Sequence, residues 1–285
     1  MIFTDEHIIE AAGKTRVVVR DGRVVEVGSP LIGHCPLAKK FKSPVVSMSQ
    51  DEIRKNIEER ISSFGMCTRK RCVISGDDFV LFGASELLSS ALLSKIIDCA
   101  VIACDGAGTV IAKNPELIQG IGGKMSGLVK TCPYEEVIKN IESNEGFVPF
   151  KEDASIDPFG GVEKALELGF SKIAVTVASS HEAEKIRQKY PETVIVAVHT
   201  TGAEREDAVR FTENSDIISA CASSFLREIA GPKALVQGGS SVPVYAMTEN
   251  GKKIVLSKIQ KTKMQVLLKG EILPFTSGKD PSPLI

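Results

Sequence analysis

The sequence predicts an α/β protein built on mostly parallel, Rossmann-like doubly wound sheets, with a small N-terminal β-hairpin module. Two apolar runs, residues 173–177 and 194–198, are nearly continuous, as strands buried on both faces of a parallel sheet are. Their centres lie about 21 residues apart, which suits tight β-α repeats with right-handed crossovers. An eight-stranded barrel is the alternative, although the first half of the chain lacks clean strands for it.

The chain opens with the predicted hairpin. Two valine-rich runs, residues 15–20 and 24–27, flank the dipeptide Asp21-Gly22, which is typical of two-residue β-turns. A loop with several prolines follows. A helix is then expected from about Ser49 to Gly65, because isoleucines repeat at helical spacing after a Ser-x-x-Glu start.

From about residue 84, expected helices and strands alternate to the end of the fold. The helices are expected at 84–97, 134–143, 160–169, 181–189, 204–213, 222–230 and 249–260, and the strands at 99–103, 147–150, 172–178, 193–198, 216–219, 233–236 and 242–247. The chain therefore divides into a hairpin module with a proline-rich loop (1–45), a first α/β half with glycine-rich loops (46–155), a second α/β half (156–262) and an irregular tail (263–285).

The composition restricts the class of protein. Basic and acidic residues nearly balance, 35 against 36, and this argues against broad electrostatic capture of nucleic acid. No apolar stretch approaches the roughly 20 residues that span a bilayer, and the first residues lack the basic and apolar regions of a signal peptide. We therefore expect a cytoplasmic protein that binds neither nucleic acid nor membranes.

Seven cysteines are present, and their odd number in a large chain without a secretion signal argues against a disulfide framework. No Cys-x2-Cys pair occurs, so the spacing does not indicate a zinc ribbon or a ferredoxin-type cluster. A metal or iron–sulfur site would have to draw on loop cysteines that folding brings together. The candidates are Cys35, Cys67, Cys104 and Cys221.

Cys104 ends an apolar run and opens a loop with Gly106 and Gly108. Two interpretations stand. The thiol is a ligand or nucleophile and the glycines admit a ligand near the backbone, or a small buried thiol precedes a tight turn that requires glycine. His199 follows another strand and is a candidate general base or metal ligand, although a strand-end histidine often only hydrogen-bonds its own loop.

Ligands of parallel α/β sheets bind beside the carboxyl ends of the strands. Cys104, residues 178–180, His199, Cys221 and residues 237–241 each follow an expected strand, so they are expected to line one crevice. Two glycine loops suggest anion binding there, one with Gly122, Gly123 and Lys124, and the other with Gly238, Gly239 and Ser240. Neither loop has the order of a P-loop, and turn-forming loops are the alternative.

Several segments resemble methanogenesis marker protein 8, and the similarity runs from about residue 7 to 256. The segments that carry it are His34-Cys-Pro-Leu37, Phe64-Gly-Met-Cys67, Cys104-Asp-Gly-Ala-Gly-Thr-Val-Ile111, Gln119-Gly-Ile-Gly-Gly123, Ala197-Val-His-Thr-Thr-Gly202 and Cys221-Ala-Ser223. The resemblance implies a methane-producing archaeal setting and a reducing cytoplasm. It implies no established reaction and assigns no catalytic residue.

Three functions are compatible with these observations. The first is a thiolate-metal protein that holds an iron–sulfur cluster or a transition metal and assists maturation of methyl-coenzyme M reductase or one of its coenzymes. The second is an enzyme that acts on a small phosphorylated, sulfonated or carboxylated metabolite, with Cys104 or His199 reacting. The third is a non-catalytic assembly factor that binds maturation proteins.

Overall fold

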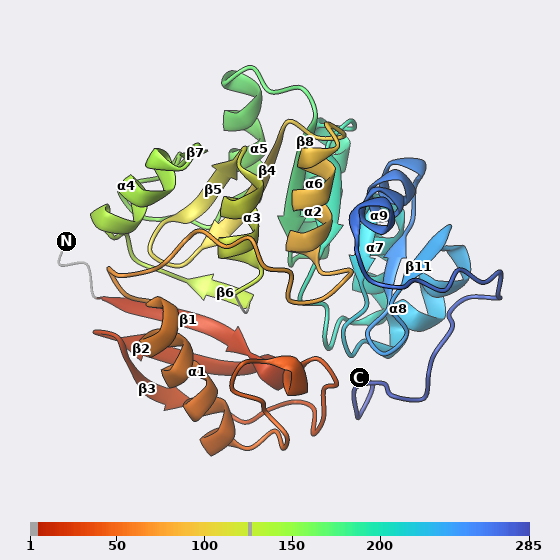
Figure 1. The fold of residues 1–285 in the computed structure, drawn as a ribbon, viewed down its shortest axis with the longest axis horizontal. Coiled ribbons are helices and arrows are strands. Elements are labelled where there is room, and N and C mark those ends of the chain that lie inside the picture. Colours follow the sequence, from red (N-terminus) through yellow and green to blue (C-terminus); the bar gives the residue numbers. More distant parts are fainter. Residues whose placement is uncertain (1–4, 125–126) are drawn as a thin grey trace.

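The computed structural model describes residues 5–124 and 127–285 and contains two sheets, one above the other in the view of Figure 1. The smaller sheet is antiparallel throughout and has the strand order β3-β2-β1-β6. Its strands are β1 (Glu6–Ala11), β2 (Thr15–Arg20), β3 (Arg23–Val27) and β6 (Gly127–Lys130). Strand β6 therefore joins the N-terminal strands from a position more than 100 residues away in the sequence.

One long helix, α1 (Gln50–Phe64), packs on this sheet. The Ser49 side chain accepts a hydrogen bond from the amide of Glu52 at the start of the helix, and Gly65 ends it with φ of 74°. Ile53 and Ile57 on α1 join Ile9 of β1 and Val17 and Val19 of β2 in a separate apolar core. Two 3-10 turns, η1 (Ala12–Lys14) and η2 (Ala38–Lys40), lie in the connecting loops.

The larger sheet has eight strands in the order β11-β12-β10-β9-β8-β4-β5-β7. These strands are β4 (Cys99–Cys104), β5 (Gly108–Ala112), β7 (Gly146–Phe147), β8 (Ile173–Val177), β9 (Val194–Ala197), β10 (Ile217–Ser219), β11 (Val236–Gly238) and β12 (Val244–Ala246). Only the neighbours β4/β8, β8/β9 and β9/β10 pair in parallel. The other four pairings in this sheet are antiparallel.

The prediction of mostly parallel, Rossmann-like sheets is therefore wrong. One error lies at the glycine-rich loop after β4, where no strand was expected before residue 147. The chain instead turns straight back into β5, with Cys104 paired to Gly108 and with φ of 84° and 70° at Gly106 and Gly108. Glycine adopts such positive φ values without strain, so the loop forms a tight antiparallel hairpin.

Helices cover both faces of the larger sheet (Figure 1). Alternate strand residues face opposite sides, so the sheet has one apolar core on each face. The helices α2 (Ala84–Leu93), α3 (Pro115–Gly122), α4 (Glu135–Ser143) and α9 (Glu249–Lys261) bury apolar side chains in the first core. The second core contains apolar side chains from four other helices, α5 (Pro158–Glu167), α6 (Ser180–Lys189), α7 (Arg205–Asn214) and α8 (Ser224–Ile229).

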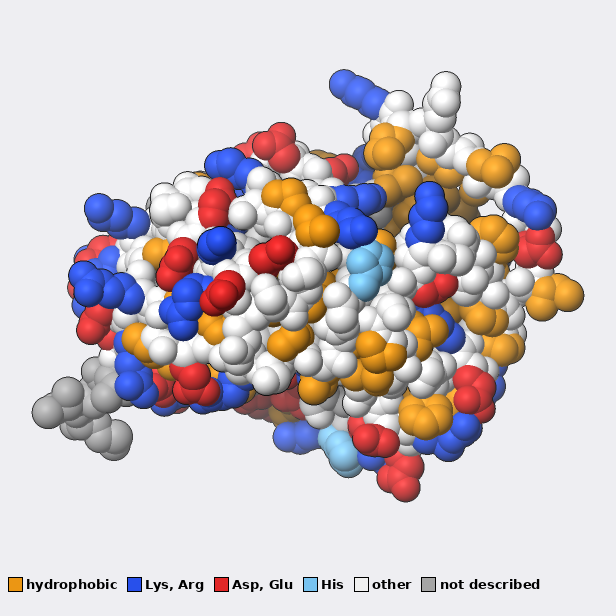
Figure 2. All heavy atoms as spheres, turned by 90° about the horizontal axis from the view of Figure 1, so that it is seen from below, with side chains coloured by type: hydrophobic (Ala, Val, Ile, Leu, Met, Phe, Trp, Pro, Cys, Tyr) orange, Lys and Arg blue, Asp and Glu red, His pale blue; other side chains and the backbone are white. Residues whose placement is uncertain are grey.

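A short 3-10 turn, η3 (Gly231–Lys233), follows α8. After α9, the C-terminal segment returns to the N-terminal region. Backbone hydrogen bonds join Ser282 to Gly33 and His34. No helix in the described part of the chain is long and apolar enough to cross a membrane. On the face shown in Figure 2, charges of both signs are interspersed, so the described residues there form no large patch of one sign.

Candidate functional site

A cavity of about 760 Å³ lies between the two sheets. The smaller sheet contributes residues of β1 and β6, and α1 contributes Asn56, Arg60 and Phe64. The larger sheet contributes the ends of its four parallel strands. A volume of this size falls within the range of cavities that enclose a small organic ligand.

The carboxyl ends of the parallel strands meet at this cavity. Ala103 comes from β4, Ser179 follows β8, His199 follows β9 and Cys221 follows β10. The in-register pairing of β8, β9 and β10 brings these ends to one edge of the sheet. The loops after β8, β9 and β10 thus line one cavity, whereas Cys104 and residues 237–241, which were expected beside them, are outside the cavity lining.

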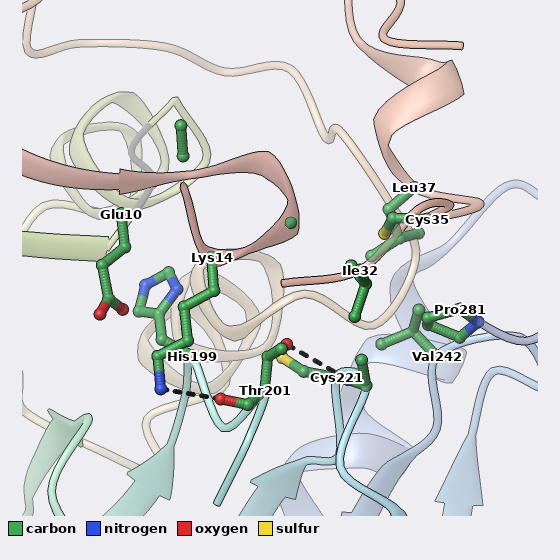
Figure 3. A pocket seen from close by; sticks show the side chains of 13 residues that line it. Glu10, Lys14, Ile32, Cys35, Leu37, His199, Thr201, Cys221, Val242 and Pro281 are labelled. Carbon is green, nitrogen blue, oxygen red and sulfur yellow. Dashed lines mark hydrogen bonds between the residues drawn. The ribbon is translucent and has the colours of Figure 1, made fainter. Parts of the chain in front are cut away.

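A recess that shares lining residues with the cavity holds several polar or titratable side chains (Figure 3). Glu10, Lys14, His199 and Cys221 line this recess of about 120 Å³. The Lys14 ammonium group donates a hydrogen bond to the carbonyl oxygen of Thr201 at 2.8 Å. His199 and Cys221 both have positive φ, 56° and 42°. Non-glycine residues in this conformation are strained, and such strain concentrates at functional sites.

The environment of His199 keeps its imidazole neutral. Surrounding protein, and then the positive charge of Lys14, lower the pKa of His199 to about 4. His199 is nevertheless exposed to solvent and lines the recess. A neutral, accessible imidazole can accept a proton from a bound molecule.

Four cationic and four acidic side chains line the cavity among the described residues. The cations are Lys14, Lys42, Arg60 and Lys124, and burial lowers the pKa of Arg60 to about 10. Glu86 already accepts hydrogen bonds from two backbone amides and the side chains of Ser85 and Gln119.

The other three acidic side chains of the wall are Glu10, Glu59 and Glu182. The Glu59 carboxylate lies 3.5 Å from the Lys42 ammonium group. Burial raises the pKa of the Glu182 carboxyl. Glu10 lines the recess together with Lys14.

Aromatic rings line the cavity beside these cations. The Phe41 and Phe79 rings stack with their centroids 5.4 Å apart. The guanidinium of Arg60 lies 4.5 Å from the centroid of Phe41, and the Lys124 ammonium group lies 5.6 Å from that of Phe64. This wall offers both an apolar surface and positive charge to a ligand.

The four cysteines proposed as metal ligands lie in two separate places. Cys35 and Cys221 line the cavity, and burial raises the pKa of the Cys35 thiol. Cys67 and Cys104 are fully buried around Asp105, and burial raises the pKa of both thiols. A metal cluster held by all four cysteines therefore stays a prediction. Their location in two separate places does not support it.

The glycine loops also differ in their surroundings. Gly122, Gly123 and Lys124 line the cavity. A Cβ on Gly106 would meet Tyr134 and Val137, and one on Gly108 would meet the backbone of Ala154. These two glycines therefore allow the chain to pack closely against itself.

The other predicted glycine loop lies outside the cavity lining. A Cβ on Gly238 would meet the ring of Phe82. Gly239 has a positive φ of 72° at a turn, and Ser240 follows it, half-buried.

A further group of polar side chains lies outside the residues that the sequence predicted as a site. One potential ligand atom from each of Asp5, His7 and Cys132 lies within 4.8 Å of the others. His7 is near the start of the chain and Cys132 follows β6, and the antiparallel pairing of β1 with β6 brings them together. No local pattern announces this pairing, so only the folded chain reveals the group.

Comparisons with known proteins agree on an uncharacterised archaeal family. Residues 7–260 match the family described as "Uncharacterized protein conserved in archaea (DUF2099)". The chain is 42% identical over 284 residues to an uncharacterized protein of Methanocaldococcus jannaschii, covering 99% of this chain and 100% of the relative. No solved structure matches. The name methanogenesis marker protein 8 stays a prediction, and the chain belongs to this family of uncharacterised archaeal proteins.

Proposed function

We propose that the protein binds a small organic anion in the cavity between its two sheets. The observation that carries this proposal is the convergence of four parallel strand ends on one cavity of about 760 Å³. Parallel α/β sheets bind their ligands at this place because the strand ends and helix starts leave backbone and side-chain groups free to face a ligand.

The wall chemistry supports a ligand with a negative group and an apolar body. Lys14, Arg60 and Lys124 line the cavity. The Glu59 carboxylate pairs with Lys42, and Glu86 accepts hydrogen bonds from backbone amides. Most of the remaining wall is apolar and includes three phenylalanines. A carboxylate, phosphate or sulfonate attached to an aromatic or aliphatic body satisfies both features.

His199 and Cys221 are the proposed reacting groups. They extend from neighbouring strands into the same recess, so an imidazole base and a thiol face one bound molecule (Figure 3). This pairing of groups suits proton abstraction or attack by the thiol on an activated carbon. The resemblance to methanogenesis marker protein 8 supports a role in methane formation, within which the anion would be a coenzyme or its precursor.

Ligand binding can be tested with the purified full chain and three variants. The probes are nucleotides, 2-mercaptoethanesulfonate and aromatic carboxylates, scored by thermal shift and then by calorimetry. Ala178→Phe fills the cavity from an exposed position, and Lys124→Gln removes one wall cation. Lys172→Gln is the matched control, because Lys172 is exposed and precedes β8 at the opposite edge of the sheet.

At least one anionic probe should stabilise the wild type and the Lys172→Gln control. Ala178→Phe should abolish that stabilisation, and Lys124→Gln should weaken it. Absence of stabilisation by every probe, together with no small molecule released when the purified protein is denatured, would contradict the proposal. Equal binding by wild type and Ala178→Phe would place the ligand elsewhere.

A further inference from the structure

We propose that Asp5, His7 and Cys132 form a binding site for a divalent transition metal of the zinc class. The site is independent of the proposed ligand, since none of the three residues lines the cavity. His7 is fully buried and Cys132 nearly so, whereas the Asp5 side chain is 31% exposed. Among the three side chains, the Asp5 carboxylate is thus the most open to solvent.

The spacing of the three ligand atoms suits tetrahedral coordination. His7 Nε2 lies 3.3 Å from Asp5 Oδ1 and 3.5 Å from Cys132 Sγ, and Cys132 Sγ lies 3.7 Å from Asp5 Oδ1. Zinc bonds of about 2.0 Å to oxygen and nitrogen and about 2.3 Å to sulfur, at tetrahedral angles, require edges of about 3.3 to 3.6 Å. The side chains thus already have nearly the separations that a metal imposes.

The surroundings hold the imidazole in a metal-binding orientation. His7 Nδ1 lies 2.8 Å from the hydroxyl oxygen of Thr131, which also accepts a hydrogen bond from the amide of Gly106. With Nδ1 engaged in this way, Nε2 is the nitrogen that faces Asp5 and Cys132. Metal-bound histidines usually have such a partner on their second nitrogen.

Tyr134 completes the group. Its hydroxyl lies 3.0 Å from His7 Nε2 and donates a hydrogen bond to the Asp5 carboxylate. It therefore lies beside two of the three ligand atoms, and tetrahedral coordination requires a fourth ligand in addition to these three. One nitrogen, one sulfur and one carboxylate oxygen favour zinc, iron, cobalt or nickel over calcium or magnesium, which prefer oxygen ligands alone.

A bound metal would tie the start of the chain to the middle of the fold. Asp5 directly precedes β1, His7 is its second residue, and Cys132 lies between β6 and α4, more than 120 residues later. Burial of the ligands and the absence of these residues from the cavity lining favour a structural metal over a catalytic one. Metal binding should therefore stabilise the whole chain.

The full chain should be purified without metal-affinity steps, stripped with a chelator and then loaded with Zn²⁺ or Co²⁺. We expect about one metal per chain by elemental mass spectrometry, a thiolate-to-cobalt absorption band, and a higher melting temperature with Zn²⁺. Cys132→Ser and Asp5→Asn should lose the band and the stoichiometric metal. Thr131→Val should weaken binding about tenfold through the second nitrogen of His7.

Cys72→Ser is the matched control, because Cys72 is the exposed cysteine and its loss should leave binding unchanged. Asp5→Asn keeps the shape of a partly exposed side chain, so it remains informative if Cys132→Ser fails to fold. Absence of stoichiometric metal in the wild type would overturn the proposal. The proposal would also be overturned if folded Cys132→Ser and Asp5→Asn retained the full metal content. This result does not depend on which ligand the cavity binds.

Discussion

Arg71 donates a hydrogen bond from Nε to Asp105 Oδ1 at 2.8 Å, and both side chains are fully buried. The second oxygen of Asp105 accepts a hydrogen bond from the amide of Cys67. Arg71 also donates to carbonyl oxygens at the end of α3. The pair therefore joins the loop after α1 to the β4–β5 hairpin and to α3.

Breaking this ion pair should destabilise the protein strongly. Asp105→Asn or Arg71→Met leaves one buried charge without its partner, and such changes cost about 3–5 kcal/mol. Chemical denaturation of each single variant and of the double variant measures this cost. The two effects should not add, because the double variant leaves no unpaired charge.

The ion pair of Arg69 with Glu136 is the control for this measurement. Both side chains are more than half exposed, so Arg69→Ala should cost less than about 1 kcal/mol. A similar loss of stability in Arg69→Ala and Arg71→Met would show that burial does not determine the effect.

The helices and strands that the sequence predicted best are those with a local sequence pattern. Strands β8 and β9 coincide with the two apolar runs, and α1 begins at its Ser-x-x-Glu start. The loop after Cys104 was ambiguous, because glycines serve both ligand approach and tight turns. Its hairpin depends on close packing against Ala154, about 50 residues away, which no local pattern records.

The two candidate sites also differ in how far the sequence predicts their residues. His199 and Cys221 could be proposed because each directly follows an apolar strand, and parallel strands bring such positions together. The grouping of His7 with Cys132 depends on β6, a strand of four residues that inserts beside β1. A short strand with a distant partner has no periodic signal long enough to predict its pairing.

The buried thiols should resist alkylation in the folded protein. Cys67 and Cys104 are fully buried and burial raises the pKa of both, so little reactive thiolate forms. Each unit of increase in pKa lowers the thiolate fraction about tenfold. Peptide mapping after timed iodoacetamide treatment should find exposed Cys72 modified first, and Cys67 and Cys104 modified only after denaturation. Early modification of Cys104 would instead favour its role as a nucleophile.

Gly108→Ala should destabilise the protein by about 2–5 kcal/mol. Its φ of 70° costs a residue with a side chain about 1–2 kcal/mol, and the new Cβ would lie 2.2 Å from the carbonyl oxygen of Ala154. Gly169→Ala separates the two effects, since Gly169 has φ of 87° but no atom within 4 Å of the Cβ position. Equal losses in denaturant unfolding of the two variants would contradict a contribution from close packing.

His199 should make the protein less stable in mild acid. Its pKa is about 4 in the folded state against 6.5 when unperturbed, so between these pH values the unfolded chain binds a proton that the folded chain excludes. The free energy of unfolding should therefore fall from pH 6.5 towards pH 4, with no contribution from His199 above that window. His199→Asn, whose side chain tolerates positive φ, should reduce this fall when urea unfolding is compared at pH 5 and 7.5. Exposed His181→Asn is the control, and an identical pH dependence in wild type and His199→Asn would contradict the prediction.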